Sequence, residues 1–180
     1  MEGLVEFSIP IKGLGDGIHR FDFHIDQSFF KHFENAPVEE GDIDLTFTLD
    51  KSPSMYVLEF DFEGTVKTAC DRCLATIDLP ISGSQQLLVK FSYEEQDEEA
   101  EVIYISPETK KLDVSKYIYE FVVLAIPMIK VYDCQEDENP PCNFDMLRYL
   151  EATEEAPPME KKVEDNPIWD ELRKKLSKDN

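Results

Sequence analysis

Hydrophobic and polar residues alternate along most of the first hundred residues, and a period of two is typical of β-strands with one buried face. The clearest examples are residues 42–49 and 55–62, which a turn at 50–53 separates. A short helix is expected at 28–33, before residues 35–37, which end in Pro37. The segments predicted as strands are 4–9, 21–25, 42–49, 55–62, 65–68, 75–79, 86–93 and 101–105.

The hydrophobic spacing lengthens after Leu112. Leu112, Ile118, Val122 and Ile126 fall on one helical face, and Pro127 ends the pattern. One long helix after a series of antiparallel strands is an α+β pattern. We therefore expect a mainly antiparallel β-sheet or partly closed barrel, covered by one long packing helix.

The chain changes character again after Leu150. Residues 151–164 are acidic, contain two adjacent prolines and offer almost nothing to bury, which is typical of a disordered linker. Residues 165–180 then predict a short tethered helix, because Ile168, Leu172 and Leu176 recur at a spacing of four with Trp169 beside them. The predicted organisation is a core domain at 1–150, a linker at 151–164 and a docking segment at 165–180.

Two cysteines, Cys70 and Cys73, lie at the tip of the hairpin predicted between residues 65 and 79. Such a C-x2-C turn resembles a zinc knuckle, because its two thiolates converge on one point. Cys134 and Cys142 supply a second pair, and four sulfurs at one metal ion form a structural site rather than a catalytic one. The seven residues between Cys134 and Cys142 exceed the usual ligand spacing, so Cys142 is the least regular member of this predicted zinc site.

Two alternatives to zinc remain for these cysteines. A C-x2-C pair in a reducing compartment can be a redox pair, but that motif opens a helix in a βαβ unit, whereas this one joins two strands. The cysteines can equally be buried, unligated thiols. Disulfides are not expected in the cytosol.

The formal net charge of −21 is the most unusual feature of the composition. It repels phosphate backbones at long range and attracts basic partners, of which ribosomal proteins are abundant examples, although acidity can also serve solubility alone. No apolar run approaches the roughly 20 residues of a membrane span, and the first residues lack the basic and apolar regions of a signal peptide. We expect a cytoplasmic protein without membrane contact.

The run Cys70-Asp71-Arg72-Cys73-Leu74 resembles the C-x-R-C-L signature of the YceD family, the large ribosomal RNA subunit accumulation proteins. Three further features follow in the order of that family. They are a long helix ending at 124–127, a cysteine loop at 131–142 and a terminal segment at 165–172 that resembles D-P-x-W-x-x-L. The resemblance implies a role in accumulation of 23S rRNA, with possible metal or nucleic-acid binding and no known enzymatic activity.

Nothing in the sequence indicates an enzyme or a small-molecule substrate. There is no glycine-rich phosphate loop, no nucleophile elbow and no H-E-x-x-H motif, and the acidic run at 94–99 is typical of a solvated loop. The expected function is that of a non-enzymatic accessory factor in large-subunit assembly. The alternative is a zinc-binding adaptor or regulatory protein that acts outside the ribosome through protein contacts only.

Two modes of partner binding follow from the residues. In the first, Arg72 at the hairpin tip contacts rRNA, with Lys67 and Lys90 on the neighbouring strands, unless Arg72 is occupied by a nearby acid or thiolate. In the second, the terminal helix docks in a partner groove or back onto its own domain, through an apolar stripe and a basic end. The residues assigned to this helix surface are Ile168, Trp169, Leu172, Arg173 and Lys174. The partner is then the large ribosomal subunit or its precursor, met through rRNA or through a basic ribosomal protein, and the second mode is slightly preferred.

Overall fold

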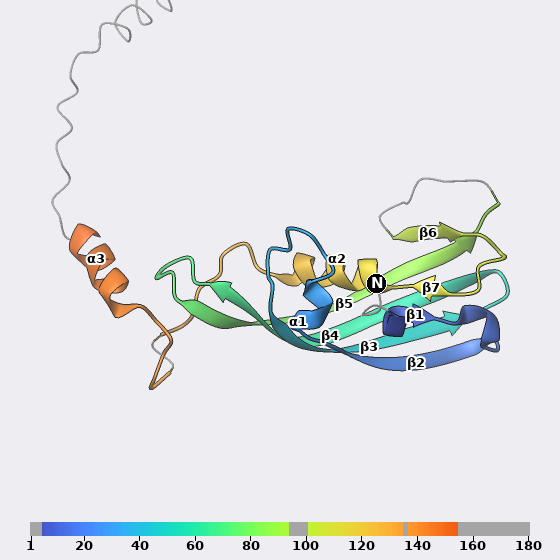
Figure 1. Ribbon diagram of the computed structural model, residues 1–180, viewed down its shortest axis with the longest axis horizontal. Helices are drawn as coiled ribbons and strands as arrows, with labels where there is room; N and C mark the ends of the chain where they lie inside the picture. Colours follow the sequence, from blue (N-terminus) through green and yellow to red (C-terminus); the bar gives the residue numbers. More distant parts are fainter. Residues whose placement is uncertain (1–4, 94–100, 135–136, 155–180) are drawn as a thin grey trace, which may run out of the picture. The chain divides into compact units, whose positions relative to one another are not determined.

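The computed structural model describes residues 5–93, 101–134 and 137–154. Its main element is a five-stranded sheet in the order β2-β3-β4-β5-β6 (Figure 1). The pairs β2–β3, β3–β4 and β4–β5 are antiparallel, and β6 runs parallel to β5. Their bounds are β2 Gly17–Ile25, β3 Gly41–Lys51, β4 Met55–Ala69, β5 Thr76–Phe91 and β6 Val102–Ile105.

Short elements complete the unit formed by residues 1–143. Strand β1 pairs with β7 as a second, two-stranded sheet, and the helix α2 follows β7 directly. The bounds are η1 Val5–Phe7, β1 Ser8–Ile9, η2 Ile11–Gly13, α1 Gln27–Phe30, β7 Leu112–Asp113 and α2 Ser115–Ala125. No helix in the described ranges is long and apolar enough to cross a membrane.

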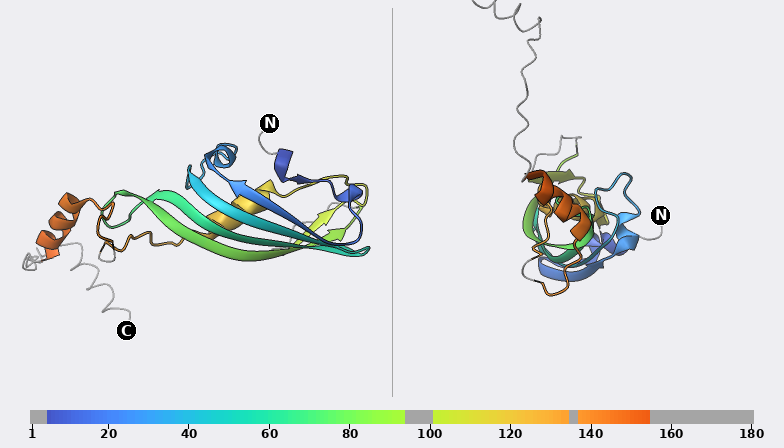
Figure 2. Two further views of the ribbon diagram at one scale, coloured as in Figure 1. Left: turned by 90° about the horizontal axis from the view of Figure 1, so that it is seen from below. Right: turned by 90° about the vertical axis from the view of Figure 1, so that its left-hand side faces the viewer.

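The expected α+β class with a mainly antiparallel sheet is confirmed, but the barrel alternative is wrong. The sheet ends at β2 on one side and at β6 on the other, and these two strands do not pair. Figure 2 shows the long strands curving together with α2 on the inner side of the curve. The helix α2 covers the inner face of the sheet, and the two edge strands stay apart.

The core lies between the inner face of the sheet and α2. Phe47 of β3 and Phe60 of β4 are fully buried with their ring centroids 5.0 Å apart. Phe121 of α2 meets Phe60 edge-on at 5.2 Å, and the neighbouring helix positions Ile118 and Val122 are fully buried. The alternation seen in the sequence therefore sends apolar residues toward α2 and polar residues to the outer face of the sheet.

The helix α2 begins and ends where its local chemistry requires. The carboxylate of Asp113 accepts the backbone N–H of Ser115 at 2.9 Å, which satisfies one free donor of the first turn. Ile126 takes an extended conformation with ψ 121° because the following residue is Pro127. The observed helix is therefore shorter than the periodicity from Leu112 to Ile126 predicts, because α2 has eleven residues.

A second unit begins at Phe144 and contains α3, Phe144–Glu154. Arg148 and Asp145 lie one turn apart on this helix with a closest N–O distance of 3.9 Å. The helix continues four residues into the segment 151–164 expected as a linker. The rest of that segment, and the docking segment 165–180, lie outside the described residues.

Candidate functional site at the cysteine turn

The cysteine turn, residues 70–74, connects the longest two strands of the sheet, as the hairpin pattern predicts. The N–H of Cys70 donates to the carbonyl of Ala75 at 2.8 Å, and the N–H of Leu74 donates to the carbonyl of Cys70 at 2.9 Å. Leu74 closes the turn in the left-handed region, at φ 59°, where a leucine is uncommon. These bonds fix a compact turn whose exposed members are Asp71, Arg72 and Leu74.

A flanking segment, residues 128–134, lies against the turn although sixty residues separate them in the chain. The N–H of Asp71 donates to the carbonyl of Lys130, and the N–H of Lys130 donates to the carboxylate of Asp71, both at 2.7 Å. The ammonium of Lys130 is a further 3.8 Å from the same carboxylate. Asp71 is therefore the residue that attaches the flanking segment to the turn.

The four cysteines divide into two kinds. Cys70 and Cys73 are free thiols with no exposed surface. Burial acts to raise the pKa of Cys70, but N–H groups of Tyr132, Cys73 and Arg72 and the side chain of Cys73 stabilise the thiolate, and the net pKa is lowered. Cys134 and Cys142 are joined as a disulfide, with their Cα atoms 6.6 Å apart.

The disulfide contradicts the expectation that no cysteine pair is oxidised. The Cα atoms of Cys134 and Cys142 lie within the roughly 4.4–6.8 Å range that a disulfide requires, at 6.6 Å. The seven intervening residues made Cys142 an irregular zinc ligand in the sequence. Closing a loop of this length costs little entropy. The spacing in the sequence alone does not reveal that its two ends meet.

The disulfide form does not fit the four-sulfur zinc site. Paired sulfurs are not thiolates, so only Cys70 and Cys73 remain as donors, whereas structural zinc takes four. Within the described parts of the chain, no three His, Cys, Asp or Glu side chains gather as a metal ion would need. The guanidinium of Arg72 instead donates to the sulfur of Cys134 at 2.9 Å. The zinc site stays a prediction that depends on reduction of this disulfide.

The predicted RNA-binding residues are only partly brought together. Lys67 lies near the turn, but its ammonium is 2.9 Å from the carboxylate of Glu40, whose hydrogen bond raises the pKa of Lys67. Lys90 pairs with Met55 at the opposite end of β4 and β5, because the hairpin continues without interruption over its whole length. Lys90 therefore does not flank Arg72. The tail residues Ile168, Trp169, Leu172, Arg173 and Lys174 lie outside the described residues.

Four exposed apolar side chains, which the sequence reasoning missed, lie in the cysteine turn and in the chain that leads from α2 to the flanking segment; we call them the apolar strip. They are Leu74, Leu124, Met128 and Ile129, which are 64%, 77%, 98% and 74% exposed. Leu124 is in the last turn of α2, and the flanking segment begins at Met128, so three of the four lie within six residues of chain. The apolar run on both sides of Pro127 is the available signal, but its spacing predicts only the end of a helix.

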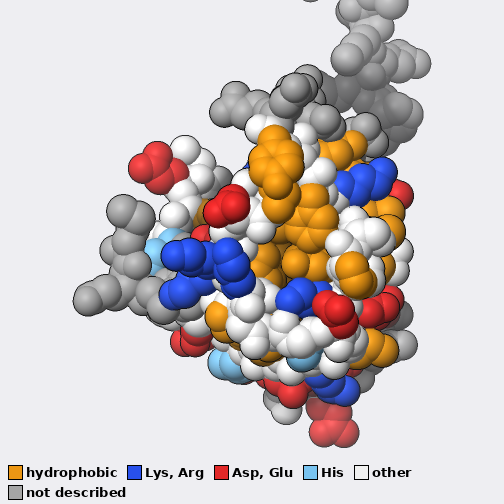
Figure 3. Space-filling view, turned by 90° about the vertical axis from the view of Figure 1, so that its right-hand side faces the viewer, with side chains coloured by type: hydrophobic (Ala, Val, Ile, Leu, Met, Phe, Trp, Pro, Cys, Tyr) orange, Lys and Arg blue, Asp and Glu red, His pale blue; other side chains and the backbone are white. Residues whose placement is uncertain are grey.

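Basic side chains gather at the other end of the sheet. The N–H of Lys12 donates to the carbonyl of Lys110 at 3.3 Å, and Lys12, Lys110 and Lys111 are all exposed. Figure 3 looks onto this end, where hydrophobic side chains lie exposed between Lys and Arg groups. Here Ile18 is 74% and Tyr93 85% exposed. This end therefore carries three exposed lysines, and sequence spacing did not join Lys12 to residues 110 and 111.

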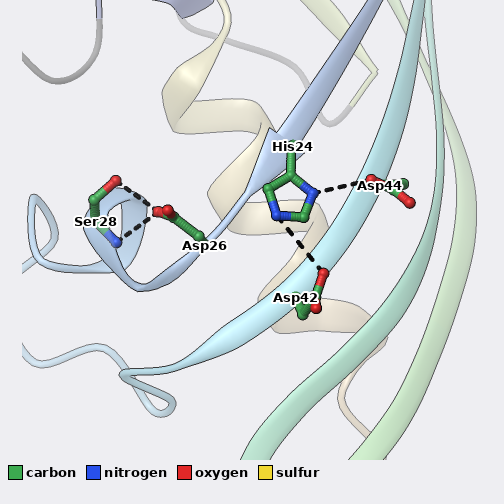
Figure 4. Close-up of polar contacts among 5 residues, drawn as sticks. All are labelled: His24, Asp26, Ser28, Asp42 and Asp44. Atoms are coloured by element: carbon green, nitrogen blue, oxygen red, sulfur yellow. Dashed lines mark hydrogen bonds and ion pairs between the residues drawn. The ribbon is translucent and has the colours of Figure 1, made fainter.

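The outer face of the sheet carries an acidic cluster around His24. Its Nδ1 is 3.0 Å from a carboxylate oxygen of Asp44, and its Nε2 is 3.7 Å from one of Asp42 (Figure 4). The hydrogen bond to Asp44, with the charges of Asp42, Asp44 and Asp26, outweighs burial and raises the pKa of His24 above 6.5. Asp26 itself accepts the hydroxyl of Ser28 at 2.6 Å and the N–H of Ser28 at 2.7 Å at the start of α1, and these two bonds lower its pKa.

We expect Asp44→Asn to lower the pKa of His24. NMR titration of the imidazole measures this pKa. Because the folded pKa lies above the unfolded value, the stability that His24 contributes is complete below about pH 6.5 and is lost as the pH rises through the folded pKa. The free energy of unfolding should therefore fall in the variant more at pH 5.5 than at pH 8.5, by less than about 1 kcal/mol because the pair is exposed. Asp22→Asn, on the same face but paired with Arg20, is the control. An unchanged His24 titration in Asp44→Asn would contradict the assignment.

These observations define a small α+β protein whose antiparallel sheet presents a cysteine-containing turn attached to a later cysteine loop. A family model described as "Large ribosomal RNA subunit accumulation protein YceD" matches residues 58–175, which is more than half of the chain. The chain therefore belongs to the YceD family, and the expectation from the C-x-R-C-L motif is confirmed. The family's name assigns it a role in accumulation of large-subunit ribosomal RNA. No curated protein and no solved structure matches the chain.

Proposed function

We propose that this chain is a cytoplasmic, non-enzymatic factor of large-subunit assembly that acts by binding a basic protein of the subunit. The observation that carries the proposal is the apolar strip. Exposed apolar side chains gathered in one region of a monomer are a feature of protein interfaces, and three of these four lie within six residues of chain. The strip is attached to a turn that the bonds between Asp71 and Lys130 hold in place, so it is presented on a fixed support.

The net charge of −21 supports a basic partner. Ribosomal proteins combine basic surfaces with apolar segments that are unsatisfied before assembly, and an acidic body with an apolar strip is complementary to both. Loss of such a factor would leave its partner unprotected, and the rRNA that needs this partner would accumulate poorly. The alternative, an adaptor that works outside the ribosome, uses the same strip with a different protein.

The test uses Met128→Asp with Ile129→Asp in the full chain, and co-sedimentation with large-subunit precursors as the measurement. Burial of each aliphatic side chain at an interface contributes about 1.5–3 kcal/mol, so the double variant should bind at least about tenfold more weakly. Both residues are exposed, so folding should be unaffected. Ile18→Asp with Tyr93→Asp removes similarly exposed apolar groups at the opposite end and should co-sediment normally. Wild-type co-sedimentation of the Met128/Ile129 variant would overturn the proposal.

A second candidate, direct contact with rRNA, is favoured by the lysines at residues 12, 110 and 111. Three ammonium groups on one exposed surface provide a few phosphate contacts, which give weak binding with a shallow salt dependence. The matching variant exchanges all three for glutamine. Loss of RNA crosslinking in that variant, with protein contacts retained, would favour this candidate over the first.

We also propose that the reduced protein holds one structural zinc ion through Cys70, Cys73, Cys134 and Cys142. The proposal is supported by the two buried free thiols and by the proximity of Cys134, which Arg72 contacts from within the turn. Untagged protein purified under reducing conditions should contain about one zinc per chain by elemental analysis, and Cys70→Ser should contain little. Cys142→Ser tests the least regular ligand. Reduced wild-type protein without zinc would exclude the site.

A further inference from the structure

One edge of the long strand β5 is open over most of its length. Its partner β6 pairs only with Leu88–Phe91. From Thr76 to Leu87, β5 pairs with β4 on one side, and no other backbone group in the described ranges bonds to its second side. An unpaired row of N–H and C=O groups is a template for an added strand.

The direction of these backbone groups follows from the register. The N–H groups of Leu88 and Ser92 donate to the carbonyls of Glu101 and Ile105 on the β6 side, at 2.8 and 3.0 Å. The β4–β5 register has no interruption between Thr76 and Lys90. Every even-numbered residue from Thr76 to Gln86 therefore directs its backbone groups to the open edge.

Pro80 independently confirms this direction. It lies at an even-numbered position in the middle of β5, and proline within a sheet is confined to positions whose missing N–H faces an unpaired edge. The nearest edge-facing donors are Asp78 before it and Ser82 after it. Pro80 also limits pairing of two copies of this edge, because it removes one donor from each.

A groove of about 700 Å³ runs along the open edge at Pro80. Asp78 lines one wall, and Asp133, Asp137 and Glu138 line the other, while no lysine or arginine lines either wall. The hydroxyl of Tyr132 donates to Asp137 at 2.5 Å and, with the N–H of Asn139, lowers the pKa of that carboxylate. The groove is therefore negatively charged at neutral pH.

We propose that a lysine- or arginine-rich segment of a partner protein adds to the open edge of β5 as an extra strand, with its cations in this groove. Main-chain bonds supply affinity in this mode and the adjoining side chains supply specificity. The charge selects the occupant: carboxylates on both walls repel a nucleic acid and a second acidic copy of this chain, and attract a basic polypeptide. The inference rests on the proposed function, since it specifies how a basic protein of the subunit is held.

The direct test measures binding of a fluorescent twelve-residue peptide of alternating lysine and valine by anisotropy. The full-length protein should bind the peptide, and affinity should fall as salt rises. Two further peptides carry N-methyl groups on one or the other alternate set of amides, so that they share the charge of the first. Only one set faces β5 in an added strand, so one methylated peptide should bind at least about tenfold more weakly and the other nearly normally. Equal binding of all three peptides would show a charge contact alone and overturn strand addition.

The protein side is tested with Ser82→Pro, which removes one edge donor, and Ser82→Ala, which keeps it. Pro80 shows that this kind of position accepts proline, and thermal unfolding checks that the variant folds. Ser82→Pro should weaken peptide binding at least about tenfold and Ser82→Ala should not. Asp78→Asn with Asp137→Asn should weaken binding and flatten its salt dependence. If Ser82→Pro instead converts a dimer to a monomer, the edge belongs to a second copy and the proposal is wrong.

Failure of strand addition is distinguishable from failure of the proposed function. If the Met128/Ile129 variant loses large-subunit precursors while Ser82→Pro keeps both peptide and precursors, only strand addition is overturned. If the wild-type protein never co-sediments with precursors, the proposed function fails, whatever the peptide does.

Discussion

Gly64→Ala is expected to lower the free energy of unfolding by about 3 kcal/mol, the upper end of the usual cost of overpacking, measured by urea denaturation. A Cβ atom at this position would lie 2.2 Å from the carbonyl oxygen of Asp42 and 2.6 Å from the Cα of Ile43. Both neighbours are backbone of the paired strand β3, so no side-chain rotation relieves the clash. Strands β3 and β4 must separate, and the end of β4 that leads into the cysteine turn moves with them.

Gly15→Ala is the matched control because no atom lies within 4 Å of the added Cβ. It should change the free energy of unfolding by less than about 1 kcal/mol. An increase is expected where the main effect of alanine is to reduce the entropy of the unfolded chain. A Gly64→Ala protein as stable as wild type would mean that the close approach of β3 and β4 at this point is not needed for the fold. The strongest stability effect is therefore predicted at a residue without a side chain.

The parts of the fold that the sequence predicted are those where one face is buried. Residues 42–49 and 55–62 alternate because their apolar members face α2, and both are strands as expected. Residues 80–85 contain proline, glycine and serine, and the predicted strands at 75–79 and 86–93 leave them out. They belong instead to one sixteen-residue strand, because the fifteen-residue β4 supplies a continuous partner.

The N-terminal strand shows the opposite error. Residues 4–9 alternate, yet of the described residues 5–9 only Ser8 and Ile9 form a strand, after the 3-10 turn of η1. Phe7 is fully buried, with its ring 4.9 Å from that of Phe29 at α1. An alternating pattern reports which residues are buried, and a short turn satisfies it as well as a strand does.

Of the candidate site, the sequence predicted the cysteine turn but not its contact with the flanking segment. A C-x2-C pair between two alternating segments placed the turn at a hairpin end. Its contact with the flanking segment depends on the single carboxylate of Asp71, which no spacing rule distinguishes from the other acids of this chain. The exposure of Met128 and Ile129 depends on where the chain goes after Pro127, which is tertiary information.

Phe60→Ala is expected to lower the free energy of unfolding by about 3–5 kcal/mol, because it leaves a cavity where the sheet meets α2. The ring is fully buried and lies 5.0 Å from Phe47 and 5.2 Å from Phe121. The contact with Phe121 is part of what holds α2 to the sheet. Hydrogen exchange should therefore accelerate in the amides of α2 more than in those of β2, the edge strand on the far side of β3.

Phe144→Ala makes the same chemical change at a phenylalanine that is 53% exposed, and should cost less than about 1 kcal/mol. Since Leu124 of the apolar strip is in the last turn of α2, loosening of that helix by Phe60→Ala should also weaken binding to large-subunit precursors at temperatures where the protein is still folded. If α2 amides keep their protection and precursors bind normally in the Phe60→Ala protein, then α2 is held by its other buried residues, Ile118 and Val122, and Phe121 is dispensable for presenting the strip.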